Sequence, residues 1–201
     1  PLHESVVRSA DAFVKAVVID QEMGSGGAGR VTFKLVRRAA GVDVPPVFVV
    51  DGYSRLRLIS YSTGSYPKLR FRRDQSWWLF LKRADIGDSW HVATPDSGSA
   101  LVEDGNVRAT YHISMRRGLV AESLYERTQA AIFEHLHGRK VEPALMSSLV
   151  ENILSRAPAM PESDSSSPAS KLLFEQHVAL ETFYHLGTAV FASRLEPFLA
   201  S

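Results

Sequence analysis

The chain has 201 residues, of which 45% are hydrophobic and 22% are charged, an ordinary balance for one folded domain with a helical extension. Its formal net charge of +1 gives no overall attraction for a polyanion, so a nucleic-acid site would need a local basic patch. The sequence contains no cysteine, which excludes disulfides, thiolate metal sites and cysteine nucleophiles. No apolar run approaches the roughly 18 residues that span a bilayer. Because the chain begins at Pro1, we expect a periplasmic or secreted protein whose signal peptide has been removed, with a cytoplasmic location as the alternative.

The first half of the chain is predicted to be rich in β-strands. Residues 11–20 and 30–38 are dense in β-branched or alternating apolar residues, and they flank four glycines within 24–29, which predicts a hairpin. Residues 77–82 (WWLFLK) are apolar on both faces, a pattern typical of a central strand that is buried on both sides. Shorter strands are expected at 47–50, 55–62, 68–73, 90–94 and 106–113.

The last third of the chain is predicted to form three helices. From about Gly118, apolar residues that include Val120 recur at helical spacing as far as a C-cap at Gly138. A second helix begins near Pro143 and carries an apolar stripe to Leu154. A third helix is expected at about 169–195.

Three stretches of the β-rich half carry a resemblance to a known family, namely residues 14–20, 32–41 and 77–84. The order of a strand, a glycine loop, a second strand and a later aromatic strand resembles the bacterial relatives of the tissue-inhibitor-of-metalloproteinase (TIMP) and netrin-like (NTR) family. The resemblance covers roughly residues 10–110, and it implies an OB-type five-stranded barrel that works by binding. The inhibitors of that family chelate a protease's zinc through an N-terminal cysteine. This chain has no cysteine, so that mechanism is not carried over.

These patterns together predict an α+β fold. An OB-like five-stranded antiparallel β-barrel is expected within residues 1–117, followed by three C-terminal helices within 118–201. A polar, serine-rich linker at 161–170 is expected to precede the last helix.

A basic stripe is the first candidate site. In RLRL (55–58) and KLRFR (68–72) cations alternate with apolar residues, so the cations share one face if the two strands pair. Cations that follow a backbone, next to aromatic rings, are what single-strand binders on OB barrels use. A solvated strand face explains the same alternation. The candidate ligand-binding residues are Arg55, Arg57, Lys68, Arg70, Arg72, Tyr61 and Tyr66.

Histidines on the predicted helices are the second candidate. His177, Glu181 and His185 follow one another at intervals of four residues, a spacing at which side chains share a helix face and can ligate a divalent metal. The alternative is two histidines at the border of a buried face, with the glutamate in water. The segment EHLH, with Glu134, His135 and His137, poses the same choice, and histidine in a last helical turn also suits the helix dipole.

No catalytic constellation and no cofactor motif is found. GxSxG is absent, and the glycines at 24–29 lack the GK[ST] of a phosphate loop. The adjacent Trp77 and Trp78 point to opposite faces of their strand. One should therefore fill the barrel core, while the other should be covered by helices or form an exposed binding surface.

The leading interpretation is a non-enzymatic binding module. It would recognise a protein partner, or alternatively an anionic polymer, through the basic sheet face or the helical surface. The first alternative is a metal-dependent enzyme with ligands on the last helix. The second is a scaffold whose helices dock on a partner while the barrel serves as support.

Overall fold

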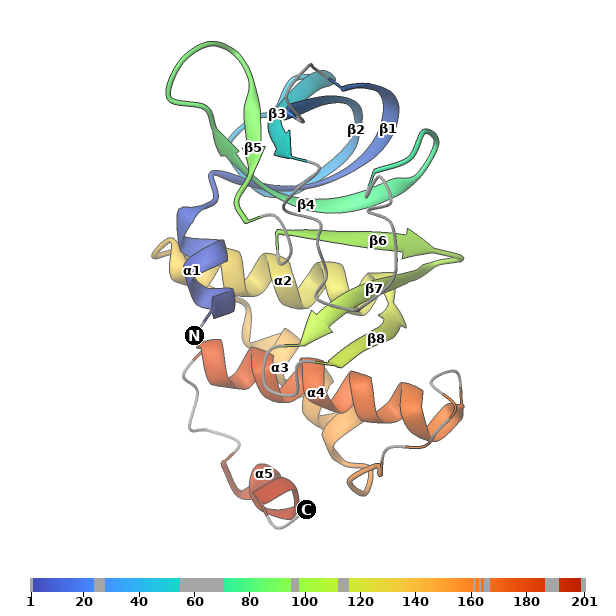
Figure 1. Ribbon diagram of the computed structural model, residues 1–201. Helices are drawn as coiled ribbons and strands as arrows, with labels where there is room; N and C mark the ends of the chain where they lie inside the picture. The colour runs from blue at the N-terminus through green and yellow to red at the C-terminus, as the bar shows by residue number, and fades with distance from the viewer. Residues whose placement is uncertain are drawn as a thin grey trace. The chain divides into compact units, whose positions relative to one another are not determined.

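The computed structural model describes residues 2–23, 28–54, 71–94, 98–111, 116–160, 162, 164, 167–186 and 192–199. The chain forms two compact units, one of residues Ser5–Val102 and one of Pro1–Glu4 together with Glu103–Ser201. The first unit contains a β-barrel, and the second contains a β-hairpin and helices (Figure 1). The predicted α+β class is confirmed.

Five strands of the first unit close into a barrel. They are β1 (Ala12–Met23), β2 (Ala28–Gly41), β3 (Val47–Ser54), β4 (Ser76–Arg83) and β5 (Trp90–Val92). The strand order is β1-β2-β3-β5-β4, and β4 pairs with β1 to close the barrel. The strands β3 and β5 run parallel, whereas the other pairs are antiparallel. This order is that of an OB-type barrel, so the predicted OB-like fold is confirmed.

The barrel core follows from the alternation of the strands. Alternate residues of β1 and β2, among them Val14, Val18 and Phe33, point inward and are buried. Three register shifts between β1 and β2 act as bulges, which increase the bending that closure requires. In β4, all side chains from Trp77 to Leu81 are buried, as its two-sided apolar pattern predicted.

The two adjacent tryptophans are both buried. Trp77 joins the barrel core, where its ring meets Phe71 edge-on at 4.8 Å. Trp78 points to the opposite face and stacks on Phe13 at 4.8 Å, with no exposed surface. Trp78 therefore does not form an exposed binding surface.

A helix and a further strand flank the barrel in sequence, and neither was predicted. They are α1 (Leu2–Ser9), which precedes β1, and β6 (Ser99–Glu103), which pairs with β4. A two-residue turn follows β6, in which Asp104 and Gly105 both have positive φ, as a tight hairpin turn requires.

The second unit contains one hairpin and the C-terminal helices. Its elements are β7 (Asn106–Tyr111), β8 (Arg116–Ala121), α2 (Glu122–Leu136), α3 (Pro143–Leu149), the π-helix η2 (Val150–Leu154), α4 (Pro168–Leu186) and α5 (Ala192–Leu199). The apolar stripe predicted for the second helix lies on α3 and η2 and packs in the core of this unit, against Ala179 and Phe183 of α4. The region predicted as a third helix contains α4 and the start of α5. No helix in the described ranges is long and apolar enough to cross a membrane.

Two predicted elements are wrong within the described residues. Gly118 and Val120 lie in β8 and not in a helix. The segment pairs antiparallel with β7, with Gly118 opposite Ala109 and Val120 opposite Val107. A Cβ at position 118 would also overlap the ring of Phe174 on α4. Residues 71–73 form a turn before β4 instead of the end of a strand. Here Asp74 takes a left-handed φ of 67°, and its N–H donates to the carbonyl of Val18 at 2.9 Å. The strand predicted at 55–62 lies outside the described residues.

Candidate ligand-binding cleft

The predicted basic stripe falls almost entirely outside the described residues. Its members Arg55, Arg57, Tyr61, Tyr66, Lys68 and Arg70 all lie within 55–70. Arg72 is described and exposed, in the turn that precedes β4, where its backbone N–H donates to Oε1 of Gln75 at 3.0 Å. The anion-binding role of the stripe therefore stays a prediction.

The predicted metal ligands of the last helix lie on α4 in a largely buried polar cluster. Glu181 and His185 are buried, with Nε2 of His185 3.9 Å from Oε1 of Glu181, whereas His177 is half-buried. The ring of His185 faces that of His3 at 5.5 Å, and Nε2 of His3 is hydrogen-bonded to Oε1 of Gln129 at 2.7 Å. In the described part of the chain, no three His, Asp or Glu side chains are placed to hold a metal ion. The metal hypothesis gains no support from this arrangement.

A buried tyrosine faces the same cluster. Burial, and to a smaller extent the charge of Glu181, raise the pKa of the Tyr125 phenol far above its ordinary value. Burial therefore favours the neutral form of the phenol. This cluster stabilises the packing of α2 on α4.

The second histidine segment is the capped end of α2. The ring of His137 stacks on Phe133 at 4.1 Å, and its Nδ1 is hydrogen-bonded to the carbonyl of the same residue at 2.8 Å. Glu134 forms an ion pair with Arg139. Two of the three proposed ligands of this segment, Glu134 and His137, therefore already have partners within the chain. The hydrogen bond of His137 also satisfies a carbonyl at the helix terminus.

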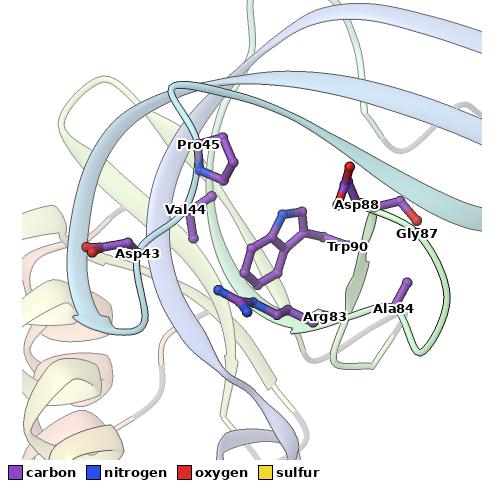
Figure 2. A pocket seen from close by; sticks show the side chains of 9 residues that line it. Asp43, Val44, Pro45, Arg83, Ala84, Gly87, Asp88 and Trp90 are labelled. Atoms are coloured by element: carbon purple, nitrogen blue, oxygen red, sulfur yellow. The ribbon is translucent and has the colours of Figure 1, made fainter.

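An open cleft with a volume of about 590 Å³ lies between two loops of the barrel (Figure 2). The β2–β3 loop and the β4–β5 loop form its walls, and the β4–β5 loop is one of the two loops at which OB barrels bind ligands. The lining residues are Asp43, Val44, Pro45, Arg83, Ala84, Gly87, Asp88, Ser89 and Trp90.

The β4–β5 loop is held at its base by backbone hydrogen bonds. The N–H of Ala84 donates to the carbonyl of Ser89 at 3.0 Å, and Gly87 adopts a φ of +84°, which lets the chain reverse. At the end of β4, the N–H of Arg83 donates to Oδ2 of Asp11 at 2.7 Å. This bond ties one wall of the cleft to the start of β1.

The β2–β3 loop is held by an arginine. The guanidinium of Arg38 donates to the carbonyl of Gly41 and pairs with the carboxylate of Asp43 at 3.2 Å. Gly41 has a φ of +87°, and a Cβ there would collide with the carbonyl of Asp11, so glycine is required. Both walls therefore have defined geometry before any ligand arrives.

An arginine and a tryptophan meet in the cleft. Trp90 is 3% exposed and belongs to the barrel core, and Cζ of Arg83 lies 5.4 Å from its ring centroid. This distance is that of a cation–π contact, which attracts the guanidinium to the indole. Figure 2 shows Arg83 and Asp88 on different sides of Trp90. Neither of these two charged groups has an ion-pair partner among the described residues.

Asp51 on β3 links the strands that border the cleft. Its carboxylate accepts a hydrogen bond from Nε of Arg30 at 2.8 Å and another from Ser89, while Nδ1 of His91 is hydrogen-bonded to its backbone carbonyl at 2.9 Å. Burial raises the pKa of Asp51, but the hydrogen bonds from Arg30 and Ser89 outweigh it and lower the pKa below its ordinary value.

This meeting of serine, histidine and aspartate is not a catalytic triad. A triad needs the hydroxyl on one imidazole nitrogen and the carboxylate on the other. Here the Ser89 hydroxyl is engaged by the carboxylate of Asp51, and the imidazole of His91 is engaged by a backbone carbonyl. The arrangement stabilises the junction of β3 with β5 and does not activate a nucleophile.

In both loops that form the cleft, exposed aliphatic side chains lie next to the lining residues in sequence. Ile86 is 90% exposed in the β4–β5 loop, between the lining residues Ala84 and Gly87. Val42 and Val47 are 42% and 52% exposed, and they precede and follow the lining segment of the β2–β3 loop. The loops that form the cleft thus carry exposed aliphatic side chains next to its lining residues in sequence.

The sequence-based reasoning did not find this cleft. Its one local signal is Ile86, a lone large aliphatic residue in the turn-like segment DIGDS, where no periodic pattern directs it to a core. No protein-family model matches the chain, and no curated protein is detectably similar to it. The similarity to the TIMP and NTR family therefore stays a prediction.

Proposed function

We propose that this protein is a non-enzymatic binding module that holds a protein partner at the cleft between the β2–β3 and β4–β5 loops. The observation that carries the proposal is the 90% exposure of Ile86 in the loop that forms one wall. Burying such a side chain against a partner contributes about 1.5–3 kcal/mol. A protein surface supplies the apolar area that this gain requires.

The composition of the cleft supports a protein partner over an anionic polymer. Its lining carries one cation, Arg83, against the two carboxylates of Asp43 and Asp88, so it has no excess of positive charge. Polyanion sites depend on such an excess. Arginine, represented here by the exposed Arg83, is by contrast among the residue types most enriched among residues that dominate protein–protein affinity. The resemblance to a family that works by binding points in the same direction.

The test starts from random peptides displayed on phage and selected on the folded protein. The affinities of selected peptides are then measured by fluorescence anisotropy for the wild type and for Ile86→Asp. We expect Ile86→Asp to weaken binding roughly ten- to a hundredfold, the equivalent of the burial energy of the side chain. Because Ile86 is exposed, the variant should fold normally.

Met160→Asp is the matched control. Met160 is 68% exposed in the other unit, so the same kind of substitution there should leave the affinity unchanged. Selected peptides that bind the wild type and Ile86→Asp equally well would overturn the proposal.

A further inference from the structure

We infer that the partner segment bound in the cleft carries an acidic side chain and a basic side chain on either side of an apolar residue. The acidic side chain pairs with Arg83 and the basic side chain with Asp88. This inference rests on the proposed function, because it names the chemistry of the partner at the same cleft.

The acidic contact follows from the state of Arg83. Its Cζ lies over the Trp90 ring, 5.4 Å from the centroid, and its side chain is exposed, with no ion-pair partner among the described residues. A guanidinium carries five N–H donors in a fixed planar fork, so an exposed Arg83 without an ion-pair partner in the described part of the chain can donate them to a ligand. A carboxylate matches this planar fork with two parallel hydrogen bonds.

The basic contact follows from Asp88. Its side chain is exposed, lines the cleft and has no ion-pair partner among the described residues. Asp43, the other carboxylate of the lining, is already paired with Arg38 at 3.2 Å. Asp88 is therefore the carboxylate of the cleft that remains for a cation of the partner.

The apolar contact follows from the β2–β3 wall of the cleft. Val44 and Pro45 line the cleft on the β2–β3 side, and Figure 2 shows them near the Trp90 ring. An aliphatic side chain of the partner can pack there without leaving a polar group unsatisfied.

Opposite charges on the two sides of Trp90 select against ligands of one sign. A purely acidic segment meets repulsion at Asp88, and a purely basic one meets repulsion at Arg83. Such pairing contributes more to specificity than to affinity, because a wrong partner buries like charges together. The cleft should therefore discriminate by the order of charges along the segment.

The experiment uses charge reversal on the full chain with the phage-selected peptides as probes. We expect Arg83→Glu and Asp88→Lys each to lower the affinity for peptides selected on the wild-type protein by at least about tenfold. Selection on the doubly reversed protein should yield peptides in which the acidic and basic positions have changed places. Arg83→Gln removes the charge with less change in size, and it serves if Arg83→Glu folds poorly.

Lys82→Glu and Asp85→Lys are matched controls. Each makes the same charge change one or three residues along the chain from a tested position, at a residue that does not line the cleft. They should leave the affinity within about twofold. If Ile86→Asp abolishes binding while both charge reversals leave it intact, the charge pairing is wrong and the proposed cleft stands. If Ile86→Asp also has no effect, the proposed function itself fails.

Discussion

Replacing Gly118 by alanine tests the packing of the second unit. Gly118 lies in β8, and a Cβ built on it would overlap Cγ, Cδ1 and Cδ2 of the buried Phe174 on α4. Cγ lies on the Cβ–Cγ axis, so turning the ring about that bond does not clear it. We therefore expect Gly118→Ala to destabilise the protein by overpacking.

The magnitude combines two opposing effects. Inserting a methyl group into a well-packed core costs about 1–3 kcal/mol. Replacing glycine by alanine contributes about 0.4–1 kcal/mol in the other direction, because the unfolded chain loses freedom. Because three ring atoms lie within 2.5 Å of the built Cβ, the overpacking cost should fall at the upper end of its range, which leaves a net loss of about 2 kcal/mol. In a chain of this size each kcal/mol lowers Tm by about 2–4 °C.

The assay is urea unfolding followed by far-ultraviolet circular dichroism, together with the background variant Phe174→Ala. That variant is itself destabilised by about 3–5 kcal/mol, but it removes all three overlapping atoms. In the Phe174→Ala background, Gly118→Ala should leave the free energy of unfolding unchanged or raise it. The difference between its effects in the two backgrounds measures the coupling between these two contacting sites. An unchanged or raised free energy of unfolding for Gly118→Ala alone would refute the close approach of β8 to Phe174.

Two further predictions concern the first unit. The pKa of Asp51 is lowered on folding, so its ion pair stabilises the protein above pH 3.8, the ordinary pKa, and is lost as the pH falls below it. Asp51→Asn should therefore lose about 0.2–1 kcal/mol at neutral pH and converge with the wild type in acid, as pH-dependent urea unfolding would show; a constant difference would contradict this. We also expect neither a single-stranded oligonucleotide nor a sulfated oligosaccharide to bind measurably at physiological salt, by anisotropy. Salt-dependent binding that is lost on changing Arg55, Arg57 and Arg70 to glutamate would instead make the basic stripe the functional site.

The sequence predicted those elements whose periodicity is set by burial. The alternation in β1 and β2 and the two-sided apolar run of β4 match buried positions in the barrel core. The stripe on α3 and η2 is likewise buried in the second unit. In each of these elements, the residues that the apolar pattern marks are the ones that long-range contacts bury. The local pattern is therefore sufficient to predict the element.

Prediction failed where a long-range contact overrides the local pattern. Gly118 and Val120 fit the start of the helical period, yet the segment is held in a strand by pairing with β7 and by the close approach of Phe174. Alternation similarly continues through 68–73, but the left-handed Asp74 and the hydrogen bond from Arg72 to Gln75 form a turn there. Such contacts join residues that are far apart in the sequence, so a pattern read from a short segment does not contain them.

The cleft shows the same limit at the level of function. Its walls come from 43–45 and 83–90, which the barrel brings together and which no motif connects in the sequence. β5 has only three residues, and in the described part of the chain it pairs with β3 through one residue pair, Val50 with Trp90. The β2–β3 loop precedes β3 and the β4–β5 loop precedes β5. No further backbone pairing joins these two loops among the described residues, and the cleft opens between them. The cation–π contact of Arg83 with Trp90 then places a charged group beside the first residue of β5. The brevity of β5, more than any single reactive residue, places this cleft on the barrel.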